Sequence, residues 1–321
     1  VENTPIKIEE KKLERTALLE AQILILQETE VPRIPETDKA RIDELLENFT
    51  MSISSLNQFI RCPLSFYYEN ILRIPTTSSE AATYGTAMHH ALQKVFDKMR
   101  FSQSKSFPSV KFFIEFFEED MKRQRGYFTK KEFKAHLEMG KENLTNYYNH
   151  HISNWGKEIK TEFIVRNIEM DGVPLTGVID RLDFHPNNKI HIVDYKTGSH
   201  STSKMRPPTK SKPEGGNYWR QLIFYKILFE EFQKKSAQYI HSAEVSYLDP
   251  NSRGEFITSQ LRFQSEDVTM VKGLIKNSYE KIMKHEFYEG CGEKNCPWCS
   301  FVKQNVTQDS LRDLEVEELD D

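Results

Sequence analysis

The chain has 321 residues, 38% of them hydrophobic and 29% charged, as in soluble globular proteins, and no apolar run is long enough to cross a membrane. The net charge of −4 would disfavour nucleic-acid binding if it were evenly spread, but residues 1–50 carry 7 basic and 12 acidic side chains, and residues 309–321 carry 1 and 7. Of the totals of 44 and 48, this leaves 36 basic and 29 acidic side chains, so the body of the chain is basic, as phosphate binding requires.

The two ends of the chain are predicted to differ from its body. Residues 1–50 have the composition of a charged helical connector arm, with its best helix candidate from Leu13 to Gln27. The chain opens with Val and with this arm, from which we expect a piece of a longer polypeptide. Residues 51–303 are expected to form one domain, and residues 304–321 an acidic tail.

Helices are predicted in the first half of the domain. Residues 52–68 are expected to contain a helix capped by Ser54 or Ser55. A second helix is expected over residues 84–99, and residues 109–154 are expected to be mostly helical.

Three consecutive strands follow. Residues 161–169, 175–184 and 189–196 are rich in β-branched and aromatic side chains. The turn signals Asp171-Gly172 and Pro186-Asn187-Asn188 separate them. The pattern predicts an antiparallel meander.

A polar loop comes next. Residues 198–216 are rich in serine, proline and lysine and almost free of apolar side chains, which predicts a mobile loop that borders the active site. Its basic side chains are candidates for binding nucleic acid, although a solvated linker remains the alternative. They are Lys204, Arg206, Lys210 and Lys212.

The last elements complete an α/β pattern. A helix is predicted over residues 217–233, strands over 243–248 and 255–261, and a final helix over 266–285. Helices therefore precede, interrupt and follow the strands. We expect a mixed central β-sheet flanked by helices.

Two acids and a lysine stand out on the strands. Side chains alternate between the faces of a strand, so Asp194 and Lys196 are predicted on one face and Tyr195 on the other. Asp180 on the preceding strand can meet them if the register allows. Buried acids are costly unless a cation meets them, and carboxylate oxygens suit Mg²⁺. The pattern favours a divalent metal site; the alternative is an ordinary ion pair of Asp180 with Arg181 or Lys196.

The chain has four cysteines, at Cys62, Cys291, Cys296 and Cys299. No secretory signal that would favour disulfides precedes them, and the last three are close enough in sequence for their sulfurs to converge. Four thiolates hold either Zn²⁺ or an iron–sulfur cluster. Zinc sites more often use two local pairs of cysteines than three local ligands and a distant one. Four inert buried thiols remain the third reading.

Together these residues resemble the PD-(D/E)XK nuclease superfamily, and most closely the branch that contains the nuclease domains of RecB and AddB. The resemblance covers roughly residues 52–301. Its motifs are Asp180, Asp194-Tyr195-Lys196, Gly85-Thr86-Ala87-Met88-His89, Gln221-Leu222-Ile223-Phe224-Tyr225, and Cys62-Pro63 with the three late cysteines. Ile179 stands where the name of the superfamily has a proline.

The resemblance implies a restriction-endonuclease-like core with helical insertions, and a role for each motif. The implied ligands of Mg²⁺ or Mn²⁺ are His89, Asp180, Asp194 and the carbonyl of Tyr195. Lys196 would orient the attacking water and offset phosphate charge. Gln221 and Tyr225 lie one turn apart on the same face of a helix, from which they could reach the active site or the nucleic-acid backbone. The alternative is that Tyr225 is a core residue and Gln221 caps a strand edge.

Two further sites follow from the resemblance. Glu162 matches an acidic position that supports the metal ligands in some relatives, although a salt bridge to Lys160 or Arg166 is the simpler alternative. The four cysteines match the ligands of a structural [4Fe–4S] cluster, which we prefer to Zn²⁺. This cluster would join the beginning of the domain to its end.

The function implied is that of a cytoplasmic, metal-dependent DNA nuclease, and more specifically an exonuclease. Relatives place such a domain behind a helicase motor, so we expect a helicase on the same chain or on a partner subunit and a role in DNA repair and recombination. One alternative is a catalytically inactive scaffold that guides DNA. Another is a metal-binding interaction module, which the basic body disfavours.

Overall fold

A computed structural model describes residues 31–76, 79–234 and 236–305. The helix expected from Leu13 to Gln27 lies outside this part of the chain. Of the acidic tail expected over residues 304–321, only residues 304 and 305 are described, and they are helical. Within it, the elements are α2 (Lys39–Leu46), α3 (Ile53–Arg61), α4 (Pro63–Phe66), the π-helix η1 (Tyr67–Ile71), α5 (Glu80–Phe101), α6 (Val110–Arg123), the 3₁₀ turn η2 (Arg125–Tyr127), α7 (Lys130–His151), β1 (Ile159–Met170), β2 (Val173–Phe184), β3 (Lys189–Lys196), the 3₁₀ turn η3 (Thr202–Met205), α8 (Asn217–Phe232), β4 (Tyr239–Tyr247), β5 (Thr258–Leu261) and α9 (Ser265–Met283).

The strands form one sheet in the order β1-β2-β3-β4-β5. Neighbours are antiparallel except β3 and β4, which run parallel because the chain returns through α8 between them. The turn between β1 and β2 has positive φ at Asp171 (50°) and Gly172 (84°), as a tight two-residue hairpin requires. The predicted mixed α/β sheet is confirmed.

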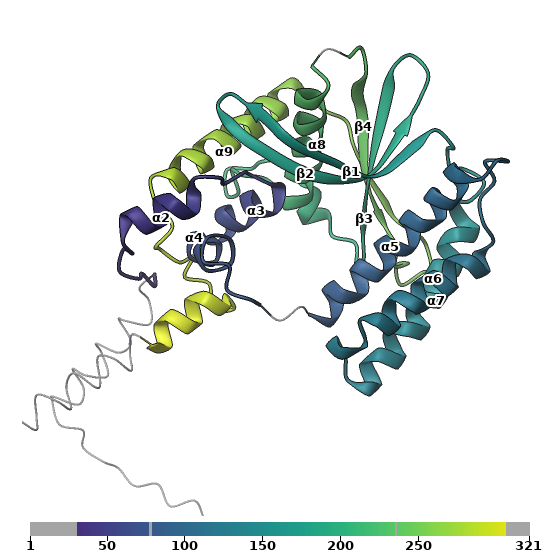
Figure 1. Cartoon of the computed structure of the whole chain (residues 1–321), viewed down its shortest axis with the longest axis horizontal. Helices are drawn as coiled ribbons and strands as arrows, with labels where there is room; N and C mark the ends of the chain where they lie inside the picture. Colours follow the sequence, from purple (N-terminus) through teal and green to yellow (C-terminus); the bar gives the residue numbers. More distant parts are fainter. Residues whose placement is uncertain (1–30, 77–78, 235, 306–321) are drawn as a thin grey trace, which may run out of the picture.

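Helices cover both faces of the sheet (Figure 1). α3, α8 and α9 pack on one face, where Trp219 and Phe224 of α8 are fully buried. α5, α6 and α7 pack on the other. α6 and α7 approach closely at Gly140, where a Cβ would lie 2.2 Å from the Phe117 ring. Ile42 and Leu46 of α2 are buried in the first layer, so packing against the domain begins before residue 50.

The start of the first helix of the domain differs from the sequence-based expectation, whereas the helical prediction for residues 109–154 is confirmed. The first helix of the domain is capped by Ser52, whose side chain accepts a hydrogen bond from the backbone N–H of Ser55. Neither Ser54 nor Ser55 is the cap, since both lie inside the helix. The helical stretch over residues 109–154 is two helices, and Thr129 begins the second with a capping box. None of the described helices is long and apolar enough to span a bilayer.

Candidate active site

The register of the sheet brings three acids into one row. Arg181 pairs with Val193 across β2 and β3, so Asp180 faces Asp194 on the next strand. Across β1 and β2 the pairs on either side of Glu162 place this residue opposite Asp180. Antiparallel neighbours that share a face lie about 5 Å apart, which brings the carboxylates of Glu162 and Asp180 together. The carboxylate of Asp194 is held next to them by partners of its own.

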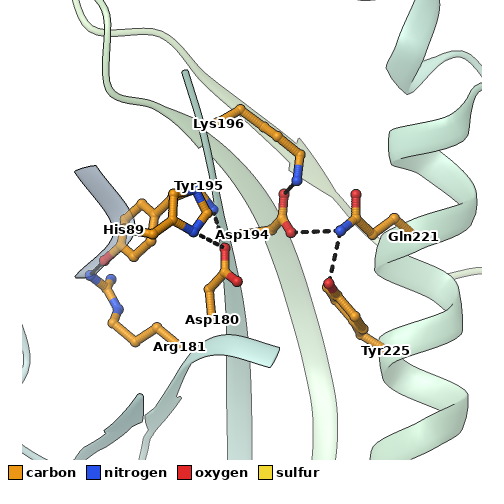
Figure 2. Close-up of polar contacts among 8 residues, drawn as sticks. All are labelled: His89, Asp180, Arg181, Asp194, Tyr195, Lys196, Gln221 and Tyr225. Carbon is orange, nitrogen blue, oxygen red and sulfur yellow. Dashed lines mark hydrogen bonds and ion pairs between the residues drawn. The ribbon is translucent and has the colours of Figure 1, made fainter. Parts of the chain in front are cut away.

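Asp194 is held by a lysine and a glutamine (Figure 2). Its carboxylate is 1% exposed. Oδ2 lies 2.7 Å from Nζ of Lys196, and Oδ1 accepts a 2.9 Å hydrogen bond from Nε2 of Gln221. The same amide nitrogen lies 2.8 Å from the hydroxyl of Tyr225. One turn of α8 therefore fixes the orientation of Asp194 from the side opposite the lysine.

Asp180 is held from a different element. Its Oδ2 accepts a 2.9 Å hydrogen bond from the backbone N–H of Tyr195 and lies 3.4 Å from Nδ1 of His89 on α5 (Figure 2). α5 can come this close because Gly85 has no Cβ; one would lie 3.1 Å from Oγ1 of Thr197 at the end of β3. The glycine and the histidine of this motif thus act together.

His89 is a neutral ligand candidate. Burial lowers the pKa of His89, and the positive charge of Lys196 lowers it further. Asp180 and a hydrogen bond to the backbone of Tyr195 raise it. The effect of burial is the largest, so the pKa lies below its usual value. The imidazole therefore keeps a lone pair at neutral pH, as metal binding requires. The hydrogen bond also places the Tyr195 backbone at the imidazole. Its carbonyl as a ligand stays a prediction.

Glu162 lies among the candidate ligands. Ligand atoms of His89, Glu162 and Asp180 all fall within 4.8 Å of one another. They line a pocket of about 310 Å³ together with Gly85 and Thr86. Glu162 has a φ of 46°, a left-handed conformation that is costly for a glutamate inside a strand. Its side chain lines the pocket. The sequence-based expectation had instead placed it behind the metal ligands.

The charges of the site fit a divalent cation. Burial, and then repulsion by Asp180, raise the pKa of Glu162 to about 7. Burial raises the pKa of Asp194 to about 7, although Lys196 opposes the change. Burial alone would lower the pKa of Lys196, but Asp194 and Asp180 raise it. One lysine cannot neutralise three facing carboxylates, and a bound divalent ion would complete the balance.

A family model described as the PD-(D/E)XK nuclease superfamily matches residues 50–304. The chain belongs to this nuclease superfamily. Two solved structures are similar to it. A candidate exonuclease from Eubacterium rectale is 13% identical with a TM-score of 0.49, over 84% of this chain and 94% of that chain. The structure of SSO0001 is 12% identical with a TM-score of 0.31, over 82% and 87%. No protein of curated function matches the sequence.

The four cysteines of this superfamily member converge as predicted. Their sulfurs all lie within 4.8 Å of one another, with Cys62 3.8 Å from both Cys299 and Cys296 and Cys291 3.7 Å from Cys299. The donor set fits a metal centre. The spacing equals that of thiols in contact, and also the edge of a zinc tetrathiolate with bonds of about 2.3 Å. In an iron–sulfur cube each cysteine sulfur binds a different iron, so a bound cluster would hold the four sulfurs farther apart than they lie in this structure.

Backbone groups pack closely around the four cysteine sulfurs. The N–H of Gly290 donates to the carbonyl of Pro32, and a Cβ on Gly290 would lie 2.6 Å from the sulfur of Cys299. The N–H of Ser65 lies 3.4 Å from the sulfur of Cys62. The cluster thereby joins the start of the domain to its last helix, which includes residues 297–305.

The basic loop is anchored beside the catalytic strand. Arg220 donates to the carbonyls of Glu214 and Gly215, at 2.6 and 3.0 Å. Lys204 contacts Tyr218, whose ring also lies under Lys196. The structure thus brings Lys204 to the same tyrosine ring as Lys196. The other predicted nucleic-acid contacts, Arg206, Lys210 and Lys212, are exposed on the same loop.

Tyr218 was not among the predicted site residues. The signal that could have found it is helical spacing, since residues 218, 221 and 225 share one face of α8. Arg181 and Asp183, which support the back of the site, also escaped prediction. Two side chains of opposite charge separated by one residue on a strand share a face, and this alternation was the available signal.

Proposed function

We propose that this nuclease-superfamily domain hydrolyses DNA phosphodiester bonds with Mg²⁺ or Mn²⁺, as an exonuclease. The observation that carries the proposal is the convergence of Asp180, Asp194, His89 and Lys196 from three separate elements. Residues serving only stability would not need three neighbouring acids, because the charge of Asp180 raises the pKa of both Glu162 and Asp194.

The chain's own residues have distinct tasks in this proposal. His89, Glu162 and Asp180 would hold the metal, together with Asp194 and the carbonyl of Tyr195. A divalent ion bound there would lower the pKa of the attacking water and offset charge on the phosphate. Hydrolysis forms a bond from this water to phosphorus and breaks the bond to the leaving sugar oxygen, which takes up a proton. Lys196 supplies positive charge beside the phosphate as negative charge develops.

Gln221 and Tyr225 position the acid on the central strand. The Gln221 amide donates to Asp194, and the Tyr225 hydroxyl contacts the same amide. These contacts leave the Asp194 carboxylate only one favourable orientation, with one oxygen at Lys196 and the other at Gln221. The catalytic role of both side chains is therefore to hold the carboxylate in place.

The wider role we propose is in DNA repair and recombination, as the nuclease of a helicase-nuclease with the motor on the same chain or a partner. The resemblance to RecB and AddB nuclease domains supports this, as does the basic body of the chain. An inactive DNA-guiding scaffold is disfavoured because such scaffolds lose motif residues, and His89, Asp180, Asp194 and Lys196 are all present.

For the cysteines we propose a structural [4Fe–4S] cluster. The support is the arrangement of one distant and three local thiolates, which resembles the cluster ligands of the RecB and AddB branch. Acid-labile sulfide and iron in an anaerobic preparation test the assignment. If the preparation contains stoichiometric zinc and no sulfide, the site is a zinc site and the cluster assignment is wrong.

Degradation of labelled linear and circular DNA, single-stranded and duplex, tests the nuclease proposal. The wild-type protein should cut with Mg²⁺ or Mn²⁺ and not with EDTA. An exonuclease should leave covalently closed circles intact, whereas cutting of circles would identify an endonuclease. DNA binding without cutting under every metal condition would favour the scaffold.

A further inference from the structure

We propose that Tyr218 and Lys204 form a binding subsite for the nucleotide next to the cleaved phosphodiester. In this subsite a base lies against the phenol ring of Tyr218, and a phosphate lies at the ammonium group of Lys204. The inference rests on the proposed function and assigns to its DNA substrate two contacts outside the metal site.

The position of Tyr218 links the catalytic face of α8 to solvent. Tyr218 occupies the first turn of α8, three and seven residues before Gln221 and Tyr225. Residues at this spacing share one face of a helix, so the three side chains form a line beside β3. Tyr225 is buried, whereas Tyr218 is half-buried at the open end of the line. A ligand can therefore reach its ring.

Two ammonium groups contact this ring. Nζ of Lys196 lies 5.2 Å from the ring centroid and Nζ of Lys204 lies 4.9 Å from it. Lys204 also donates a 3.2 Å hydrogen bond to the Tyr218 hydroxyl. The tyrosine thus joins the catalytic lysine to the basic loop.

The two lysines differ in how their charge is balanced. Lys196 is paired with the Asp194 carboxylate at 2.7 Å. In the described ranges of the chain, no carboxylate forms an ion pair with Lys204, which is exposed. Its positive charge therefore remains available to an anion beside the active site.

The backbone that carries Lys204 is fixed before any ligand binds. The carbonyl of Lys204 packs against the start of α8, where a Cβ on Gly216 would lie 2.1 Å from it. The N–H of Gly216 donates to the carbonyl of Arg206 at 2.8 Å. Only glycine permits this approach, so η3 and α8 hold the pair at a set position. Such preorganisation lowers the cost of binding.

The chemistry of the pair selects a nucleotide strand. A cation would be repelled by two ammonium groups, and a small anion would leave the ring unused. Single-stranded nucleic acids use both features, because bases stack on aromatic side chains while basic groups follow the phosphates. The contact of Lys204 with the ring is weak because this lysine is exposed, so a base and a phosphate can replace it.

Binding to two oligonucleotides tests the base contact. The probes are fluorescein-labelled strands of about 15 nucleotides, which matches typical site sizes; one is thymidine throughout and the other carries abasic sites throughout. Anisotropy is measured in EDTA at low salt, so that no cutting occurs. Tyr218→Ala should weaken binding of the thymidine strand about tenfold and leave the abasic strand nearly unchanged. Tyr218→Phe keeps the ring and should bind the thymidine strand almost as the wild type does.

The phosphate contact is tested by salt dependence. Lys204→Gln should reduce the slope of log affinity against log salt by about one unit, for both oligonucleotides. Matched controls are Tyr239→Ala, an exposed tyrosine beside Lys189 at the opposite end of β3, and Lys276→Gln, an exposed lysine on α9. Neither control should change affinity or slope.

The outcomes separate this inference from the proposed function. Equal loss for both oligonucleotides with Tyr218→Ala, or no loss, overturns the base contact, and an unchanged salt slope with Lys204→Gln overturns the phosphate contact. Lack of wild-type binding overturns both. Cutting is measured separately with Mg²⁺. If the wild-type protein binds as expected but never cuts, the nuclease proposal fails, and Tyr218 and Lys204 stand only as a nucleotide-binding pair without a cleaved bond beside it.

Discussion

Arg181 forms its ion pair with Asp183, whereas the adjacent Asp180 contacts His89. The guanidinium contacts both oxygens of Asp183, at 2.8 and 2.9 Å, and donates to the hydroxyl of Tyr195 at 2.5 Å. Because side chains alternate along β2, Arg181 and Asp183 point to the face opposite Asp180. The arginine next to the candidate metal ligand therefore does not neutralise it, and the pairing of Asp180 with Arg181 weighed from the sequence is not realised.

The buried pair should be costly to break from one side. Asp183→Ala leaves the Arg181 charge buried without its carboxylate, which we expect to lower the free energy of unfolding by about 3–5 kcal/mol. The double change of Arg181→Met with Asp183→Leu should cost less than this single change. Urea unfolding monitored by circular dichroism gives both values. A double variant that is less stable than Asp183→Ala would contradict the expectation.

Lys196→Ala should abolish most cutting and leave the fold intact. The lysine supplies positive charge where the transition state becomes more negative, so we expect the rate to fall by about 10²-fold or more. Single-turnover degradation of labelled DNA with Mg²⁺ measures it. Lys189→Ala at the other end of the same strand is the control and should cut at the wild-type rate. Wild-type cutting by Lys196→Ala would remove the lysine from the mechanism.

Gln221 and Tyr225 should matter in a graded way. Gln221→Leu removes the donor to Asp194, and loss of a group that orients a ligand typically costs about 10- to 100-fold in metal affinity or activity. Tyr225→Phe keeps the donor and removes only the second contact of the amide, so a loss of a few-fold is expected. Titration of cutting against Mg²⁺ concentration distinguishes the two. A larger defect for Tyr225→Phe would reverse the proposed roles.

Removal of one cysteine should destabilise the domain without changing the active site. Cys299→Ser leaves three thiolates, and we expect loss of the bound metal and a lower melting temperature, because metal binding is coupled to folding. Metal analysis and thermal unfolding are the measurements. Ser300→Ala, the next residue, is the control. Full metal content in Cys299→Ser would show that this sulfur is not a ligand.

His151 should make the protein less stable in mild acid. Burial, aided by His150 and Arg181, lowers its pKa from 6.5 to about 4. As the pH falls, His151 takes up a proton near pH 6.5 in the unfolded chain but only near pH 4 in the folded chain. The folded state therefore loses stability as the pH falls from 6.5 to about 4. Urea midpoints at about pH 7 and pH 5 measure the effect. His151→Gln should lose less stability than the wild type over this window, and exposed His241→Gln should lose as much. An unchanged slope for His151→Gln would contradict the assignment.

The parts of the fold that follow from local sequence were predictable. The hairpin at Asp171-Gly172 and the alternation along residues 189–196 specify β-structure within a few residues of chain. The same alternation predicted that Asp194 and Lys196 share a face, and their 2.7 Å contact agrees. The capping residue was harder to predict, since Ser52, Ser54 and Ser55 can all accept the required hydrogen bond, and tertiary packing decides among them.

Contacts across elements were not predictable from the residues alone. The place of Glu162 depends on the register between β1 and β2 and on a left-handed backbone, neither of which its neighbours specify. The contact of Tyr218 with Lys204 depends on how residues 198–216 fold back onto α8. Sequence patterns give the face of an element, whereas the partner of that face is set by the whole fold.

The cysteine cluster has a consequence for the order in which the molecule is made. Cys62 and Cys299 touch although 237 residues separate them. At about 5–20 residues per second, a ribosome needs on the order of tens of seconds to add the missing partner. The hairpins of β1, β2 and β3 can pair during this time, but the cluster site cannot assemble. A metal that needs all four sulfurs could therefore bind only after residue 299 has been made, and a translation product that stops before residue 291 would have only one of the four cysteines.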